Sequence, residues 1–232
     1  RQEQNRASVG FSDGSSADYD LVVGADGIYS SVRELAISAT PPLYAGTVIW
    51  RSLVSTRPRG VSHLTILMGD GCYFGLVPMG DGHTYGFGAV GGTRCADPTG
   101  GRLEHFRDRF AGFGGPVPAY LDALVCDEQL HVGPMEWMDL DHWYAGRVVL
   151  LGDAAHAGPP NMAQGGCMAM EDALVLAEEL RLADTVETGL ASYVARRRPR
   201  ADWVQEQSRI AAQAWVVPTA MRNDTLRRRG DR

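Results

Sequence analysis

The chain has 232 residues, of which 44% are hydrophobic and 22% charged, so it is long enough for one large globular domain or two small ones. Its formal net charge of −6 and the lack of aromatic residues clustered with the arginines argue against a nucleic-acid-binding protein. All 22 basic residues are arginines, which excludes a lysine Schiff base and a Walker-type phosphate lysine.

The sequence carries no sign of a membrane-spanning or secreted protein. No apolar run approaches the ~18 residues of a membrane-spanning helix, and residues 1–9 are too polar for a signal peptide. The cysteines Cys72, Cys95, Cys126 and Cys167 lie too far apart to indicate a zinc site or a disulfide framework. We therefore expect a cytoplasmic protein with reduced thiols and no metal site.

The N-terminal part predicts a hairpin that leads into an acidic turn. Residues 7–11 and 20–23 are predicted strands on either side of an Asp-Gly turn. The second strand ends in Gly-Ala-Asp-Gly at residues 24–27, and Ser-Ser-Val-Arg follows at residues 30–33. Asp26 would thus stand at a strand end, with Arg33 close enough to pair with it. Taken alone, this pattern also fits an ordinary strand-to-helix turn with an internal ion pair.

After a linker at residues 41–46, the middle of the chain predicts an antiparallel meander. Apolar or aromatic runs separated by Gly-Asp-Gly turns predict strands at residues 47–54, 63–68, 72–79 and 83–90. Because side chains alternate along a strand, Tyr73 and Phe74 should face opposite ways, whereas Tyr85 and Phe87 should share a face. Any single aromatic residue of this sheet is more easily explained as core than as a ligand contact.

Residues 146–166 form the stretch around which the chain is organised. The apolar run 148–151 predicts a buried strand that ends at Gly152 and Asp153, and ligands of open α/β sheets bind at such strand ends. Two prolines stiffen the loop that follows, and Gly165 and Gly166 allow a close backbone approach. A helix then begins, whose positive N-terminal end would stabilise an electron-rich or anionic ring edge.

Helical patterns surround these strands. The helix after Gly166 has an apolar stripe made of Met170, Ala173, Leu174, Ala177 and Leu180. A short amphipathic helix is predicted at residues 103–113, stopped by Pro116 and Pro118. Residues 190–198 predict a helix that ends at Pro199, and a second helix runs over residues 201–216. The arginine runs at residues 196–198 and 227–229 are interpreted as solvated faces or a loose basic tail.

Two of these stretches together resemble the FAD-dependent aromatic-hydroxylase family, the single-component flavoprotein monooxygenases. The family pattern Gly-Asp-Ala-Ala-His, Pro, Gly-Gln-Gly and Glu-Asp-Ala is matched at residues 152–156, Pro160, residues 163–165 and residues 171–173. Ala163 replaces the usual glycine, a mild change if its φ stays negative. Residues 24–33 are similar to the family's Asp-Gly fingerprint.

The resemblance implies an α/β fold. This fold is a partial FAD-binding domain, Rossmann-like and of the glutathione-reductase type, with an inserted antiparallel β-sheet substrate domain and C-terminal helices. Residues 1–40 and 136–185 would belong to the FAD-binding domain, residues 41–135 to the substrate domain and residues 186–232 to the helices. The family uses FAD as cofactor and NAD(P)H as co-substrate.

The resemblance also implies roles for particular residues. Asp153 would bind the ribityl chain of FAD, and the backbone of residues 163–167 would lie against the isoalloxazine ring. The implied cofactor contacts are Asp26, Arg33, Gly152, Asp153, Pro160, Ala163, Gln164, Gly165, Gly166 and Cys167. Arg51 and Tyr85 are candidates for substrate binding. His156 would hydrogen-bond the loop, and no side chain is expected to be catalytic because the flavin carries the chemistry.

The implied reaction is the hydroxylation or epoxidation of an aromatic or polyene small molecule with NAD(P)H and O₂. Residues 164–172 look most like the branch that contains urate hydroxylases and carotenoid epoxidases, and no Trp-x-Trp-x-Ile-Pro segment points to a halogenase. However, the family's first motif, Gly-x-Gly-x-x-Gly after a strand, is absent. The alternative is therefore a non-catalytic fragment or interaction partner. An open sheet edge would call for a complementing N-terminal segment or a homodimer.

Overall fold

In the computed structural model, the described residues are 2–3, 5–94 and 100–230, so Cys95 lies outside the described residues, as does the side chain of Arg229. The chain divides into two compact units, which are treated separately below. Unit 1 comprises Arg1–Leu43 and Glu136–Ile210, and unit 2 comprises Tyr44–Met135 and Ala211–Arg232. The C-terminal helices are therefore shared between the two units. Every helix in the described ranges is too short or too polar to cross a membrane.

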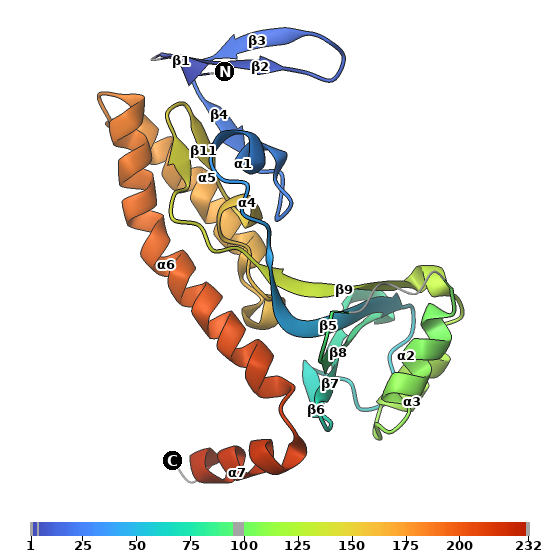
Figure 1. Ribbon diagram of the computed structural model, residues 1–232. Helices are drawn as coiled ribbons and strands as arrows, with labels where there is room; N and C mark the ends of the chain where they lie inside the picture. Colours follow the sequence, from blue (N-terminus) through green and yellow to red (C-terminus); the bar gives the residue numbers. More distant parts are fainter. Residues whose placement is uncertain (1, 4, 95–99, 231–232) are drawn as a thin grey trace. The chain divides into compact units, whose positions relative to one another are not determined.

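Unit 1 combines two small sheets with helices. Its elements are β1 (Gln2–Glu3), β2 (Arg6–Gly10), β3 (Ser16–Tyr19), β4 (Val22–Gly24), α1 (Ser31–Ala36), β10 (Tyr144–Ala145), β11 (Val148–Leu150), α4 (Asp153–His156), the 3-10 turn η3 (Pro160–Met162), α5 (Gly165–Leu182) and most of α6 (Val186–Trp215). β4 and β11 lie side by side and run parallel, with Val22 opposite Val148 and Gly24 opposite Leu150 (Figure 1).

The N-terminal hairpin differs from the sequence prediction in its second strand. β2 pairs with β3, from Ala7 opposite Tyr19 to Gly10 opposite Ser16, rather than with residues 20–23. The apolar run after residue 20 instead forms β4, which belongs to the sheet ordered β10-β11-β4. This run pairs in parallel with β11, but as the end strand of the sheet it is not buried on both faces, since Val23 is 43% exposed.

The helix α5 forms where the sequence predicted a helix, but its apolar stripe is not its buried side. Met170 and Leu174 are 63% and 72% exposed, whereas Met168, Asp172 and Leu176 face the core of unit 1. The carboxylate of Asp172 is neutralised by Arg197 at 2.7 Å, so this face can be buried although it carries a charge. The apolar periodicity therefore pointed to the wrong face of the helix.

The helix α6 is continuous through Pro199, where the sequence predicted a break. Residues on both sides of the proline are anchored in the same core, among them Tyr193 and Val204. This packing offsets the loss of one backbone hydrogen bond at the proline. The arginine run before Pro199 is not a solvated face, because Arg197 is buried and Arg198 donates to the carbonyl oxygens of Leu140 and Asp141.

Unit 2 is built on a five-stranded sheet with short helices on one side. Its elements are β5 (Leu43–Val54), β6 (Thr65–Met68), β7 (Cys72–Pro78), the 3-10 turn η1 (Gly80–Gly82), β8 (Thr84–Gly91), α2 (Arg102–Phe110), α3 (Val117–Asp122), the 3-10 turn η2 (Asp127–Gln129), β9 (Leu130–Trp137) and α7 (Thr219–Gly230). The strand order is β6-β7-β8-β5-β9. β5 thus lies beside β8 and the sheet is not a simple meander. Pro116 and Pro118 begin α3, because proline is accepted in the first turn of a helix.

The two faces of this sheet have different neighbours. One face packs Trp50 and Phe74 against Phe106 and Phe110 of α2, and this cluster is the main core of unit 2. The other face carries Tyr73, which confirms the predicted alternation with Phe74. The face of Tyr73 also includes Phe87, Ala89 and, from the end of α6, Trp215.

Candidate functional site

The two acidic turns meet at one edge of the short parallel sheet. Because β4 and β11 are parallel neighbours, Gly24 and Leu150 are paired and the turns that follow them emerge side by side. The guanidinium of Arg33 joins the two turns, since it donates to the carbonyl oxygen of Ala154 at 3.1 Å and to that of Ile28 at 2.7 Å. This edge is where open α/β sheets bind their ligands.

A pocket of about 310 Å³ lies beside the second turn, entirely within unit 1. Its walls come from the loop between α4 and α5, from the first turn of α5 and from α6. The lining residues are Asp153, His156, Gly158, Pro159, Pro160, Ala163, Gln164, Gly165, Gly166, Met168, Ala201, Val204, Gln205 and Ser208. The structure therefore brings six of the ten predicted cofactor contacts to one cavity. The other four, Asp26, Arg33, Gly152 and Cys167, are outside the lining.

Asp153 offers a free carboxylate at this pocket. Its side chain is exposed and hydrogen-bonds to none of the described residues. A Cβ added to Gly165 would lie 3.8 Å from Asp153 Oδ1, so the carboxylate stands next to the start of α5. The first N–H groups of a helix have no acceptor within the helix, and the carboxylate and these donors therefore border the same cavity.

Two backbone positions shape the turn and the loop. Gly152 has φ 59° and ψ −142°, a conformation reserved for glycine, and an added Cβ would lie 2.9 Å from the Cβ of Ala169. Alanine in place of the family's glycine at position 163 would be a mild change only with a negative φ. Ala163 instead has φ 52°. A left-handed alanine costs roughly 1 kcal/mol, which makes Ala163 a strained position.

The first acidic turn is used internally. Asp26 accepts hydrogen bonds from Ser30 Oγ at 2.5 Å and from the amide of Val32 at 3.1 Å, at the start of α1. Burial acts to raise the pKa of Asp26, but these hydrogen bonds outweigh it and lower the pKa. Arg33 does not form the expected ion pair with Asp26, because its guanidinium is turned to two backbone carbonyl groups.

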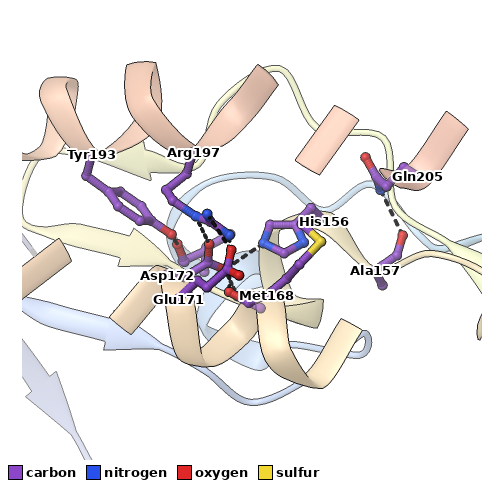
Figure 2. A network of polar contacts seen from close by, with 10 residues as sticks. His156, Ala157, Met168, Glu171, Asp172, Tyr193, Arg197 and Gln205 are labelled. Carbon is purple, nitrogen blue, oxygen red and sulfur yellow. Dashed lines mark hydrogen bonds and ion pairs between the residues drawn. The ribbon is translucent and has the colours of Figure 1, made fainter. Parts of the chain in front are cut away.

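A fully buried carboxylate lies behind the pocket. Asp172 Oδ2 accepts from the amide of Gly152 at 2.9 Å and from His156 Nε2 at 2.6 Å, and Oδ1 accepts from Arg197 Nε at 2.7 Å (Figure 2). Burial acts to raise the pKa of Asp172, yet the hydrogen bonds from His156, Arg197 and Gly152 lower it, so the group is ionised. His156 therefore contacts α5, and its partner is not the loop as the sequence suggested.

The residues of α6 that hold this region were missed by the sequence analysis. Arg197 also donates to the carbonyl oxygen of Met168 and to Glu171, and Arg200 donates to Gln164 Oε1. The side-chain amide of Gln205 bridges the carbonyl oxygens of Met138 and Ala157. A signal was present in the sequence, because Arg197 is in helical phase with the apolar residues Tyr193, Ala201 and Val204.

The candidate substrate residues lie on one face of the sheet of unit 2. Arg51 is opposite Phe87 across β5 and β8, and Tyr85 is two residues from Phe87 along β8, so the three side chains share a face. Burial raises the pKa of the Tyr85 hydroxyl, and the charge of Arg51 acts in the opposite direction. Arg51 Nε is buried without a hydrogen-bond partner among the described residues.

The described cysteines and metal-binding side chain types were also located. Cys72, Cys126 and Cys167 are free thiols. Within the described ranges, no group of three His, Cys, Asp or Glu side chains is placed to hold a metal ion.

Comparison with known proteins supports the family that the motifs resemble. A family model described as an FAD binding domain matches residues 124–208. The aurachin C monooxygenase/isomerase of Stigmatella aurantiaca is 37% identical over 226 residues, which cover 92% of this chain and 58% of that protein. The FAD-dependent urate hydroxylase of Mycolicibacterium vanbaalenii is 36% identical over 203 residues, which cover 84% of this chain and 51% of that protein.

Solved structures agree with these relatives. Klebsiella pneumoniae HpxO complexed with FAD and uric acid matches with a TM-score of 0.87 at 30% identity, over 97% of this chain and 59% of that one. These matches support the resemblance to the FAD-dependent aromatic hydroxylases that the motifs indicated, and the chain has part of their α/β fold. It spans a little more than half the length of these curated relatives.

Proposed function

We propose that this chain is the part of an FAD-dependent monooxygenase that carries the second flavin motif and the substrate sheet. The whole protein would hydroxylate or epoxidise an aromatic or polyene small molecule with NAD(P)H and O₂. The observation that carries the proposal is the pocket at the end of β11, where the free carboxylate of Asp153 and the amide groups at the start of α5 border one cavity. When bound, FAD supplies the redox chemistry of such a reaction.

The residues present fit this cofactor. The Asp153 carboxylate would accept hydrogen bonds from the hydroxyl groups of the ribityl chain. Gly165 and Gly166 allow a flat ring to approach the backbone, and an added Cβ at Gly166 would meet no atom within 4 Å. The N-terminus of α5 would stabilise negative charge on the ring edge that it faces. Asp26 and Arg33 would support the phosphate side of the cofactor through the first turn.

Arg51 and Tyr85 are proposed to contact the substrate. A half-buried guanidinium with an unpartnered Nε can donate to a ring oxygen or a carboxylate, and Tyr85 and Phe87 offer aromatic faces beside it. Urate, the substrate in the name of one relative, is a planar ring with such oxygens. The chemistry of this face supports an aromatic substrate better than a polyene.

We further propose that β4 takes another strand. β4 ends the sheet β10-β11-β4, and the side chain of Val23 is 43% exposed there. A hollow of about 510 Å³ lies alongside, and its lining includes Val22, Val32 and Leu35. An open parallel edge with apolar side chains is a pairing site. The occupant would be a complementing N-terminal segment or a second copy of the chain.

The test is a titration of the purified chain with FAD, followed by the quenching of flavin fluorescence. Asp153→Ala should weaken binding about tenfold or more, because a hydrogen bond to a charged group is lost at an otherwise unchanged pocket. Asp184→Ala, which removes an exposed carboxylate between α5 and α6, is the matched control and should bind like the wild type.

Each other outcome has a definite meaning. Equal binding by the wild type and Asp153→Ala contradicts the assignment of Asp153. Binding by neither protein favours the alternative of a non-catalytic piece that needs a complementing segment. Sedimentation or light scattering of the same samples then distinguishes a second copy from a missing strand donor.

A further inference from the structure

The Asp172 network connects three parts of the pocket wall through one side chain. Asp172 is 0% exposed and accepts every hydrogen bond in which it takes part. Its three donors belong to the turn before Asp153, to the end of α4 and to α6. Figure 2 shows the donors from α4 and α6, His156 and Arg197, on either side of Asp172. Two residues of this network, His156 and Met168, line the cavity, whereas Asp172 and Arg197 do not.

The ionised carboxylate determines which nitrogen of His156 carries the proton. A carboxylate without a proton can only accept, so the 2.6 Å contact requires a hydrogen on Nε2. In the neutral ring Nδ1 then has none and is an acceptor. No described residue donates to Nδ1, and His156 lines the pocket. His156 therefore offers Nδ1 as a hydrogen-bond acceptor in the wall of the cavity.

The same carboxylate holds the backbone that carries Asp153. The amide of Gly152 donates to Asp172 Oδ2 at 2.9 Å, and Gly152 is in a conformation that only glycine adopts readily. Arg197 fixes Asp172 from the other side and also donates to the carbonyl oxygen of Met168 at 3.3 Å. The turn, the ring and the first turn of α5 are thus held by one pair of opposite charges.

We propose that Asp172, supported by Arg197, is a positioning residue that fixes the Gly152 turn and keeps His156 in the Nε2–H tautomer, so that Nδ1 is an acceptor for an N–H or O–H group of the pocket's ligand. This rests on the proposed function only for the statement that the pocket binds a ligand. The tautomer and the turn are properties of the chain itself and are measured without cofactor.

Asparagine at position 172 is the informative substitution. It has the shape of aspartate, but one of its two polar atoms is an NH₂ donor. An NH₂ group that faced Arg197 would place a donor against a guanidinium cation, so the opposite orientation is expected. The NH₂ group then faces Gly152 and His156, the ring must become the Nδ1–H tautomer, and the Gly152 amide loses its acceptor. If Asp172 only filled space, its replacement by asparagine would cause neither change.

The experiment is nitrogen-15 NMR of the histidine rings and of the Gly152 amide at about pH 8.5, where histidine is mostly neutral. His156→Gln identifies the His156 signal. The wild type should show the Nε2–H tautomer and a protected Gly152 amide. In the Asp172→Asn variant, the population of the Nδ1–H tautomer should increase. The hydrogen of the Gly152 amide should exchange with solvent about tenfold faster or more. Glu171→Gln, which neutralises the neighbouring carboxylate paired with Arg197, should change neither the tautomer nor the exchange of the Gly152 amide.

The wild-type spectrum alone can overturn the inference, so it does not depend on whether a variant folds. An Nδ1–H tautomer or an imidazolium in the wild type contradicts it, as does an unprotected Gly152 amide. An unchanged tautomer in folded Asp172→Asn contradicts it too. Failure of FAD binding with the expected NMR result would reject the proposed function and leave this inference intact.

Discussion

The pocket of unit 1 and the aromatic face of unit 2 are built in opposite ways. The pocket wall is backbone held in place by a buried network in which each polar group of Asp172 and Arg197 has a partner. The face of unit 2 is made of side chains, and the Nε of Arg51 has no partner in the described part of the chain. A backbone site suits a ligand that is always the same, whereas a side-chain site can be changed by single substitutions.

The largest expected effect tests the network of unit 1. Asp172→Ala should lower the free energy of unfolding by about 3–5 kcal/mol, because Arg197 is left as a buried charge without its main partner. Glu171→Ala removes a pair whose carboxylate is 49% exposed and should cost less than about 1 kcal/mol. Urea-induced unfolding measures both. Equal effects of the two variants would mean that burial of Asp172 is unimportant.

The pH dependence of that difference checks its electrostatic origin. The pKa of Asp172 is lowered in the folded state, so its stabilisation is complete above the unfolded-state pKa and is lost as the pH falls through the folded pKa. The difference between wild type and Asp172→Ala should therefore be constant near neutrality and shrink at acid pH, below about 4. A difference that is independent of pH down to acid unfolding would indicate lost packing instead.

The next effect tests the aromatic face of unit 2. A Cβ on Gly75 would lie 2.0 Å from the ring of Phe87, so Gly75→Ala should cost about 1–3 kcal/mol and displace that ring. Gly80→Ala is the control, because its Cβ would meet no atom within 4 Å. Thermal unfolding and near-ultraviolet circular dichroism follow the two changes. If Gly75→Ala behaves like the control, Phe87 does not rest on β7.

The smallest effect concerns the strained loop of the pocket. Ala163→Gly should raise the free energy of unfolding by at most about 1 kcal/mol, because glycine adopts φ 52° without a steric cost, which outweighs its larger loss of backbone entropy. Ala183→Gly, at φ −84°, should instead destabilise by roughly 0.5–1 kcal/mol through backbone entropy. Denaturation midpoints give the sign of each change. A destabilised Ala163→Gly variant would show that the left-handed alanine is not under strain.

Local patterns were sufficient for much of the fold. The strands β7 and β8 follow from apolar runs beside Gly-Asp-Gly turns, β5 follows from its own apolar run, and α5 begins at the glycine pair that the sequence marked. The loop side of the pocket was predicted because its motif is contiguous in sequence, whereas the α6 side was missed, and the resemblance to the family followed from the same motif. These features depend on neighbours a few residues away, which a sequence displays directly.

The sequence by itself thus determined the resemblance to the family, the main elements and the loop that lines one side of the pocket. The tertiary structure alone decided that β5 lies beside β8, that α5 buries Asp172 instead of its apolar stripe, and that Arg197 is internal. The physical reason is that a buried charge is stable only beside a partner, and the partner of Asp172 lies 25 residues away on another helix. Hydrophobic periodicity cannot reveal such a pair, because each member taken alone looks like a surface residue.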